Sequence, residues 1–293
     1  MSVLQAVRDW GEMIKFSHSV FALPFAALAA FLAARPGLPT VSQLGLVLVC
    51  MVAARSAAMT FNRIVDAGID ARNPRTAGRH IPRGAISRRG AWSFFVAAAA
   101  LFMGGCAGFL LIEGNAWPLL LGGPVLLILC FYSYTKRFTR WSHVVLGAGI
   151  AFAPVAAWIA VSPETLGAAG WLLMLAVATW IAGFDVIYAC QDAEFDRGAG
   201  LHSLPSTIGV GRALLAARGL HAVTVAGLVG VGLLSGMGVI YFVGVGCVVV
   251  LLIVENAIVS ANDLSRVNVA FFTVNGVVGL VLGGLGIADV LMG

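Results

Sequence analysis

The chain has 293 residues, of which 60% are hydrophobic and 11% are charged, and its mean hydropathy is +0.97. This composition excludes a soluble globular domain, a disordered chain and a disulfide-rich secreted scaffold. The net charge of +5 comes without a basic run interleaved with aromatic residues, so nucleic acid is not an expected partner. We therefore expect an all-α protein embedded in membrane lipid, because the apolar runs are continuous rather than alternating.

Apolar runs long enough to cross a membrane follow one another along the whole chain. A crossing helix needs about 20 apolar residues. Nine runs meet this requirement, at residues 16–34, 41–65, 91–112, 117–135, 143–161, 167–190, 213–234, 238–258 and 268–291. Together they predict nine transmembrane helices and a single domain over residues 1–293.

The basic residues predict how these helices are oriented, because Lys and Arg concentrate in cytoplasmic loops. When the N-terminus is placed in the cytoplasm, only Arg35 of the 18 Lys and Arg residues falls in an external loop. We therefore expect a multi-pass protein of the inner (cytoplasmic) membrane with a cytoplasmic N-terminus.

The acidic residues cluster at the inner ends of two predicted helices. Six of the 13 Asp and Glu residues lie in the two short segments 62–70 and 185–196. In the first segment, Asn62, Asp66 and Asp70 are four residues apart, so they form one polar stripe on a helix. The second segment repeats this spacing. Tyr188, Asp192 and Asp196 are four residues apart, and Asp185, seven residues before Asp192, falls on nearly the same face.

Carboxylates buried within a membrane cost free energy, so they usually mark a functional site or an ion pair. Two stripes of oxygen ligands favour Mg²⁺, which binds a few carboxylates and completes its shell with water and phosphate oxygens. Neither stripe contains the His and Cys ligands typical of zinc. The alternative is a purely structural role, in which these aspartates lie at the water interface and pair with nearby arginines.

Basic residues accompany the carboxylates on the same predicted side of the membrane. Arg75 and Arg79 follow the first stripe, and Lys136 and Arg137 follow the fourth predicted helix. Metal-bound carboxylates and flanking cations would together bind a diphosphate, whose oxygens the metal and the guanidinium groups share. The alternative is that these charges only follow the positive-inside rule or contact anionic lipid. A lipid-soluble substrate with a diphosphate headgroup fits the layout.

The chain resembles the UbiA superfamily of intramembrane prenyltransferases, whose two helical motifs are NDxxDxxxD and DxxYAxxDxxxD. Here the first motif reads Asn62-Arg63-x-x-Asp66-x-x-x-Asp70, and the second reads Asp185-x-x-Tyr188-Ala189-x-x-Asp192-x-x-x-Asp196. The loop from Arg75 to Gly84 and the Lys136-Arg137 pair also resemble the family. The one departure is Arg63, where the family pattern has aspartate, and we expect its side chain to point away from the stripe.

This resemblance implies a nine-helix bundle around a central cavity and an enzyme that transfers a prenyl group from a polyprenyl diphosphate to a small aromatic acceptor. It implies that Arg55 binds the acceptor and that Tyr188 stabilises an allylic cation. It also implies one set of residues for Mg²⁺ and the prenyl diphosphate, assisted at the phosphates by Arg75, Arg79, Lys136 and Arg137. That set is Asn62, Asp66, Asp70, Asp185, Asp192 and Asp196. The catalytic residues among these are Asp66, Asp70, Asp185 and Asp192, together with Tyr188. The acceptors it favours are benzoate-type or naphthoate-type precursors of ubiquinone or menaquinone.

Polar residues outside the two stripes are expected to have structural roles. Glu255, Asn256 and Asn275 are expected to form hydrogen bonds between helices. His80 and His143 belong to no metal-ligand spacing, and neither is expected in the site.

Three other functions fit the sequence less well than prenyl transfer. A cation-coupled transporter would place its carboxylates at the membrane midplane rather than at one face. A lipid-binding scaffold offers no reason for two metal-type stripes. A CDP-alcohol phosphotransferase would carry its aspartates in one compact segment, whereas Asp66 and Asp192 are separated by 126 residues.

Overall fold

The computed structural model describes residues 3–14 and 19–293, and the chain divides into two compact units. The first unit comprises Met1–Ser19 and Leu48–Tyr134, and the second comprises Val20–Val47 and Thr135–Gly293. Each unit is described below by itself. The single domain over residues 1–293 stays a prediction.

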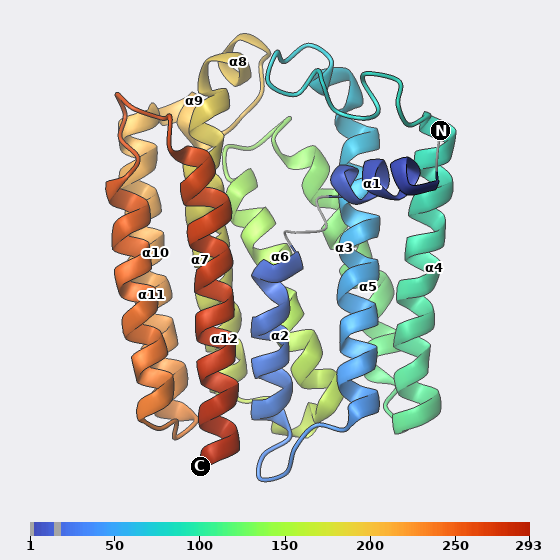
Figure 1. Ribbon diagram of the computed structural model, residues 1–293, viewed down its shortest axis with the longest axis vertical. Helices are drawn as coiled ribbons and strands as arrows, with labels where there is room; N and C mark the ends of the chain where they lie inside the picture. The colour runs from blue at the N-terminus through green and yellow to red at the C-terminus, as the bar shows by residue number, and fades with distance from the viewer. Residues whose placement is uncertain (1–2, 15–18) are drawn as a thin grey trace. The chain divides into compact units, whose positions relative to one another are not determined.

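The described residues form helices and connecting segments, without a strand longer than one isolated bridge between Ser260 and Asp263. Figure 1 shows the helices in order along the chain. Their bounds are α1 Val3–Met13, α2 Ser19–Ala33, α3 Val41–Asp70, α4 Arg88–Glu113, α5 Trp117–Thr135, α6 Ser142–Val161, η2 Pro163–Thr165, α7 Ala168–Ala189, η3 Cys190–Asp192, α8 Ala193–Gly198, α9 Leu204–Ile208, α10 Val210–Leu234, α11 Val239–Ala257, η4 Val269–Val274 and α12 Asn275–Met292.

Eight helices in the described residues are long and apolar enough to cross a membrane, so the chain is an all-helical, multi-pass membrane protein. They match eight of the nine predicted spans. The other span, expected at 16–34, corresponds to α2, whose apolar part Phe21–Ala33 is shorter, and its residues 16–18 lie outside the described residues. The ninth crossing, the central cavity and the orientation of the N-terminus stay predictions.

The first unit begins with a helix that hydropathy did not predict. Helix α1 carries charged residues on one face and apolar residues on the other, so it lacks the continuous apolar run of a span. Its last residue, Met13, and the following Ile14 are buried in one cluster with Ile64 and Ala67 of α3. Figure 1 shows α1 running crosswise to α3. A short amphipathic helix therefore packs against the part of α3 that carries the first stripe.

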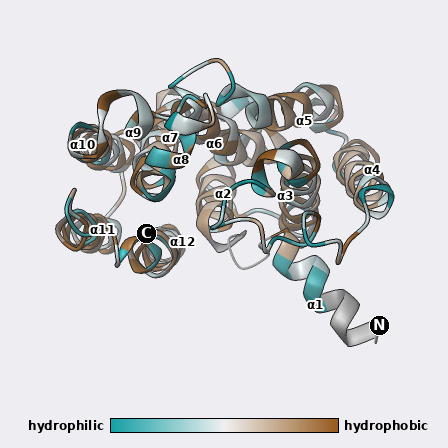
Figure 2. Cartoon of the chain, turned by 90° about the horizontal axis from the view of Figure 1, so that it is seen from above, coloured by the Kyte–Doolittle hydropathy of each residue, from teal (hydrophilic) through white to brown (hydrophobic). Residues whose placement is uncertain are grey.

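In the second unit, α7 packs against α6 on one side and α10 on another. The contact with α6 depends on Gly147, because a Cβ atom there would lie 2.3 Å from the carbonyl oxygen of Ala178. Small residues permit such close approach between membrane helices. Figure 2 shows hydrophilic residues at α8 and hydrophobic residues along α10 and α11.

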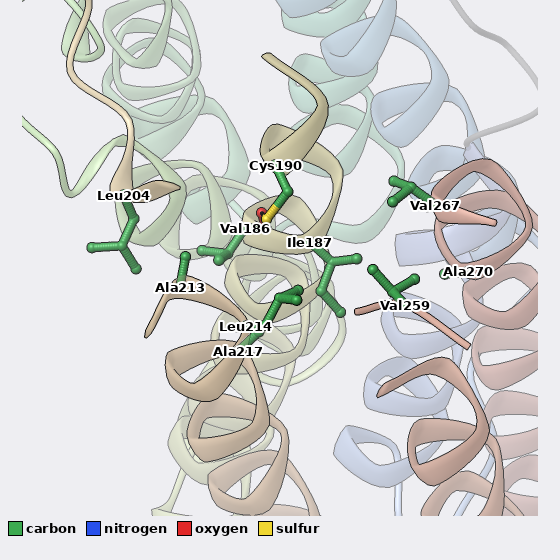
Figure 3. Close-up of a cluster of buried hydrophobic side chains, with 10 residues drawn as sticks. All are labelled: Val186, Ile187, Cys190, Leu204, Ala213, Leu214, Ala217, Val259, Val267 and Ala270. Carbon is green, nitrogen blue, oxygen red and sulfur yellow. Dashed lines mark hydrogen bonds between the residues drawn. The ribbon is translucent and has the colours of Figure 1, made fainter. Parts of the chain in front are cut away.

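A buried cluster fixes the end of α7 that leads into the second motif. Figure 3 shows ten side chains from α7, η3, α9, α10, η4 and the segment before η4 in this cluster. Its members are Val186, Ile187, Cys190, Leu204, Ala213, Leu214, Ala217, Val259, Val267 and Ala270. Side chains packed in this way hold membrane helices together mainly through van der Waals contact. The backbone of the second motif is thus held on a packed base.

Polar side chains satisfy helix ends at the other end of this unit. Asp289 of α12 accepts hydrogen bonds from the backbone N–H groups of Gly238 (2.6 Å) and Tyr241 (3.2 Å) at the start of α11. Arg35 donates to the carbonyl oxygen of Ser235, directly after α10, at 2.7 Å. Free N–H and C=O groups at helix ends need such partners where water is scarce.

Candidate active site

The first carboxylate stripe lies on the last three turns of α3, as its spacing predicts. Asn62 donates from Nδ2 to Oδ2 of Asp66 at 3.0 Å, and the same nitrogen lies 3.4 Å from the Ser133 hydroxyl of α5. Asp70 is the last residue of α3. The stripe therefore continues to the end of its helix, where the chain turns into a polar loop.

Asp70 is buried, with 3% of its surface exposed, and its two carboxylate oxygens differ in their partners. Oδ1 accepts a hydrogen bond from Nη1 of Arg79 at 2.6 Å. Oδ2 is buried and has no hydrogen-bond partner among the described residues. An unpartnered buried carboxylate oxygen is rare and calls for a ligand. Its chemistry fits a hard cation such as Mg²⁺.

The Arg72–Ile86 loop brings Arg79 to this carboxylate through its own hydrogen bonds. Asn73 accepts the backbone N–H of Arg75 on Oδ1 at 3.0 Å, and Thr76 donates from its hydroxyl to the carbonyl oxygen of Asp70 at 3.1 Å. These bonds turn the chain back over the end of α3. Arg75 is exposed on this loop, whereas Arg79 is half-buried beside Asp70.

Arg63 corrects one expectation, because its side chain does not point away from the stripe. The guanidinium is buried and donates from Nη1 to Oδ1 of Asn62 at 3.4 Å. Its Nε donates to the carbonyl oxygen of Met13 at 3.4 Å. Residue 63 lies on a different side of the helix from Asn62, but the long Arg side chain reaches back to the stripe. The residue that departs from the family motif therefore contacts a predicted metal ligand.

Arg55 lies two turns before Asn62 on α3. Its Nε atom is buried and has no hydrogen-bond partner among the described residues. The residue as a whole is half-buried, but a buried N–H group of a guanidinium is costly without an anion or acceptor. Such a group is suited to bind a carboxylate.

The second stripe corrects another expectation, because it does not lie on one continuous α-helix. Helix α7 ends at Ala189, the 3₁₀ turn η3 follows, and α8 begins at Ala193. Asp185 and Tyr188 therefore belong to α7, Asp192 to η3 and Asp196 to α8. A 3₁₀ turn winds more tightly than an α-helix, so the spacing of four no longer gives one straight face.

Asp196 and Lys136 interact electrostatically in the second unit. Asp196 is buried, forms a hydrogen bond with Ser203 and interacts electrostatically with Asp192 and Lys136. The carbonyl oxygen of Lys136 accepts the backbone N–H of His202 at 2.7 Å, which ties the α5–α6 loop to the segment after α8. Arg137, the next residue, is exposed.

His143 is a site residue that the sequence did not predict. Its Nδ1 atom lies 2.7 Å from Oδ2 of Asp185, and its Nε2 atom accepts the backbone N–H of Leu204 at 3.3 Å. Because Nε2 accepts, we assign the ring proton of neutral His143 to Nδ1, which then donates to Asp185. The available signal was its position at the start of α6, soon after the basic run that contains Lys136.

Tyr188 joins an aromatic cluster in the second unit. Its ring centroid lies 4.2 Å from that of Phe271, which lies 5.1 Å from the ring of Phe184. Phe61, close to the first motif in sequence, contacts Trp92 and other aromatic rings of the first unit instead.

The fold and these residues define a class, a multi-pass membrane protein with carboxylates and basic residues at the ends of apolar helices. The sequence profile of the UbiA prenyltransferase family matches residues 22–277. The chain belongs to the UbiA prenyltransferase family and is a prenyltransferase. The cation-coupled transporter and the CDP-alcohol phosphotransferase are thereby set aside.

Relatives of known name and structure agree with this assignment. The chain is 30% identical to the 4-hydroxybenzoate octaprenyltransferase of Cronobacter sakazakii over 87% of this chain and 85% of that protein. It is 33% identical to a UbiA homologue from Aeropyrum pernix K1, with a TM-score of 0.82, over 93% of this chain and 98% of that one. A UbiA homologue from Archaeoglobus fulgidus bound to GPP and Mg²⁺ is 21% identical, with a TM-score of 0.74, over 97% of this chain and 99% of that one, and shares the fold.

Proposed function

We propose that this protein transfers a polyprenyl group from a prenyl diphosphate to a small aromatic acid, in a reaction that requires Mg²⁺. The observation that carries the proposal is the buried Oδ2 of Asp70, which has no hydrogen-bond partner in the described part of the chain, while Oδ1 of the same carboxylate is bound by Arg79. A metal-binding carboxylate beside a guanidinium is suited to a diphosphate. The name of the 30% identical relatives, 4-hydroxybenzoate octaprenyltransferase, supports the acceptor class.

Mg²⁺ would be held by oxygen atoms of both motifs. In the first, the ligands would be Asn62, Asp66 and Asp70, and in the second Asp185, Asp192 and Asp196. Mg²⁺ seldom takes this many protein ligands at once, so some of these groups would act through bound water. When bound, the metal supplies positive charge that stabilises the departing diphosphate.

Basic residues of this chain would bind the remaining diphosphate oxygens. Arg79 is half-buried and already oriented by Asp70, so it is suited to a fixed contact. Lys136 interacts with Asp196 and is suited to a second contact. Arg75 and Arg137 are exposed and would bind as the substrate enters.

The reaction itself follows from the charge that these groups stabilise. The allylic carbon–oxygen bond breaks, and its electron pair leaves with the diphosphate. A ring carbon of the acceptor then forms a bond to the allylic carbon, and the ring loses a proton. The ring of Tyr188 would face the allylic cation, which an aromatic face stabilises. Water must be excluded, because it would capture the same cation.

Arg55 would bind the carboxylate of the acceptor. Its buried Nε–H, which has no partner within residues 3–14 and 19–293, favours an anionic acceptor over a neutral phenol. Both the benzoate-type and the naphthoate-type acceptors carry such a carboxylate, so this contact selects aromatic acids without separating the two. Either acceptor would place the protein in ubiquinone or menaquinone synthesis.

The distribution of Lys and Arg supports an inner-membrane location with the site open to the cytoplasm. Among the 18 Lys and Arg residues, only Arg35 falls in an expected external loop.

Incubation of membranes with labelled prenyl diphosphates tests the proposed function. We would supply geranyl and longer diphosphates, Mg²⁺ or EDTA, and either 4-hydroxybenzoate or 1,4-dihydroxy-2-naphthoate. The expected result is a prenylated aromatic acid that forms only with Mg²⁺. Product with 4-hydroxybenzoate alone would exclude the naphthoate reading, and transfer that persists in EDTA would contradict the proposal.

A further inference from the structure

A buried polar network in the second unit lies outside the carboxylate stripes. Glu255 of α11 and Asn275 of α12 are both 0% exposed. Asn275 donates from Nδ2 to Oε1 of Glu255 at 2.7 Å and accepts on Oδ1 the indole N–H of Trp180 at 2.7 Å. Three apolar helices are thus joined through one amide. Buried groups of this kind are expensive in a membrane and often mark a functional site.

The same amide holds an unusual turn. Residues Val269–Val274 form the π-helical turn η4 directly before α12, and Asn275 donates from Nδ2 to the carbonyl oxygen of Ala270 at 3.0 Å. A π turn widens the helix, and such turns are frequent at functional sites. Here the turn carries Phe271 and Phe272, whose ring centroids lie 4.7 Å apart.

The two ends of the network meet the aromatic cluster around Tyr188. On α7, Trp180, Phe184 and Tyr188 are four residues apart, so they form one aromatic stripe. Trp180 and Phe184 lie 5.2 Å apart between ring centroids. Phe271 of the π turn packs on Phe184 at 5.1 Å and on Tyr188 at 4.2 Å.

This stripe leads directly into the second carboxylate motif. Asp185 lies next to Phe184 on α7, Tyr188 is itself part of the motif, and Asp192 follows in the 3₁₀ turn η3. The donor's diphosphate and its allylic carbon are adjacent in one molecule. A diphosphate held at these carboxylates would therefore place its first isoprene unit against the aromatic rings.

We propose that Asn275 and Glu255 are positioning residues for prenyl transfer, which hold the π turn and Trp180 and so fix an aromatic wall of Trp180, Phe184, Tyr188 and Phe271. In this wall the half-buried ring of Tyr188 would face the allylic group, and the buried rings of Trp180 and Phe184 support it through Phe271. The proposal rests on the proposed function above. The wall keeps the cation in contact with ring faces and away from water. When the wall is loosened, water competes with the acceptor for the allylic carbon.

The competing reaction has a product that can be measured. The allylic carbon–oxygen bond breaks and its electron pair leaves with the diphosphate, as in transfer. The oxygen atom of water then bonds to the allylic carbon and loses a proton, which gives the prenyl alcohol. The ratio of prenyl alcohol to prenylated aromatic acid therefore reports how well the wall excludes water, independently of how much protein is active.

The test compares two substitutions of one residue. Glu255→Leu removes the acceptor for Asn275, whereas Glu255→Gln keeps an oxygen that accepts the same hydrogen bond. We expect Glu255→Leu to raise the alcohol-to-product ratio roughly fivefold or more, and Glu255→Gln to stay within about twofold of the wild type. Trp180→Phe, which removes only the indole N–H contact and some volume, gives the same test should Glu255→Leu fail to accumulate in membranes.

Asp289→Asn is the matched control, because Asp289 also joins α11 and α12 but caps the start of α11 and makes no contact with the wall. It should lower thermal stability without changing the product ratio. A Glu255→Leu ratio equal to that of the wild type, with both products reduced in proportion, would overturn the inference. A wild-type protein that prenylates no aromatic acid would overturn the proposed function as well, so the two failures are distinguishable.

Discussion

His143 donates a 2.7 Å hydrogen bond from Nδ1 to Oδ2 of Asp185, while its Nε2 accepts the backbone N–H of Leu204. The first residue of the second motif is therefore held by a histidine from another helix, and that histidine is held by the start of α9. Groups that orient a metal-binding carboxylate in this way often affect metal affinity as strongly as the ligands themselves.

Replacing His143 should therefore weaken metal-dependent activity. We expect His143→Ala to lower kcat/KM by about 10–100-fold and to raise the Mg²⁺ concentration needed for half-maximal activity. His143→Asn is the conservative variant, because its amide nitrogen can still donate to Asp185, and it should recover part of the loss. An unchanged Mg²⁺ titration curve for His143→Ala would show that Asp185 does not depend on this histidine.

Arg63 should modulate how tightly the first motif binds Mg²⁺. Its guanidinium donates to Oδ1 of Asn62 and adds positive charge near Asp66 and Asp70. Replacement by a neutral residue frees that oxygen and removes the repulsion of a cation. We expect Arg63→Gln to lower the half-saturating Mg²⁺ concentration by about threefold or more. Arg89→Gln, an exposed change at the start of α4, is the control, and a higher Mg²⁺ requirement for Arg63→Gln would contradict this account.

Arg55 should act on the acceptor rather than on the donor. Loss of a charge-assisted contact to a carboxylate costs about 1.5–3 kcal/mol, which corresponds to about 10–100-fold in binding. Arg55→Ala should therefore raise the KM for 4-hydroxybenzoate by this factor and leave the KM for the prenyl diphosphate nearly unchanged. If both KM values rise together, Arg55 serves the fold of α3 or the donor site instead.

His80, in the loop after α3, should make stability depend on pH. Burial, helped by nearby Arg83, lowers the pKa of His80, while Asp9 at 3.8 Å and Glu12 at 3.7 Å act in the opposite direction; Arg63 adds a smaller lowering effect. Since the folded-state pKa lies below the unfolded value, the unfolded chain binds the proton more readily. The stability contributed by neutral His80 is present above the unfolded pKa and is lost as pH falls.

Thermal unfolding in detergent checks this expectation. Between about pH 7.5 and about pH 5.5, the Tm of the wild type should fall more than that of His80→Gln. This window stays above the range in which Glu12, whose pKa is lowered by its ion pair with Arg8, begins to titrate. Parallel Tm curves for the two proteins would contradict the assignment.

Hydropathy predicted the long helices well, because a membrane span needs a continuous apolar run that is visible in the sequence. The expected span 117–135 coincides with α5. Each of the other expected spans differs from its own helix, or from η4 and α12 taken together, by five residues or fewer at either end. Helix α1 was missed because it has an apolar face and a charged face instead of a continuous apolar run. The burial of its C-terminal end with Ile64 and Ala67 depends on tertiary packing, which the sequence does not show.

The motifs predicted which polar residues belong to the candidate site but not how their side chains are arranged. Asn62 and Asp66 form the expected stripe because a regular helix fixes their spacing. The break at η3, the reach of Arg63 back to Asn62 and the pairing of His143 with Asp185 all depend on backbone or side-chain geometry that spacing does not encode. The aromatic wall likewise depends on a π turn that no local sequence pattern predicts.

The central claim is that carboxylates of both motifs carry a metal-dependent prenyl transfer. The most direct measurement is the transfer of a labelled prenyl group to 4-hydroxybenzoate by membranes that contain Asp66→Asn or Asp192→Asn, each compared with the wild type at equal protein in the membrane. We predict that either substitution lowers transfer by about 100-fold or more. Near-normal transfer by either variant would contradict the account.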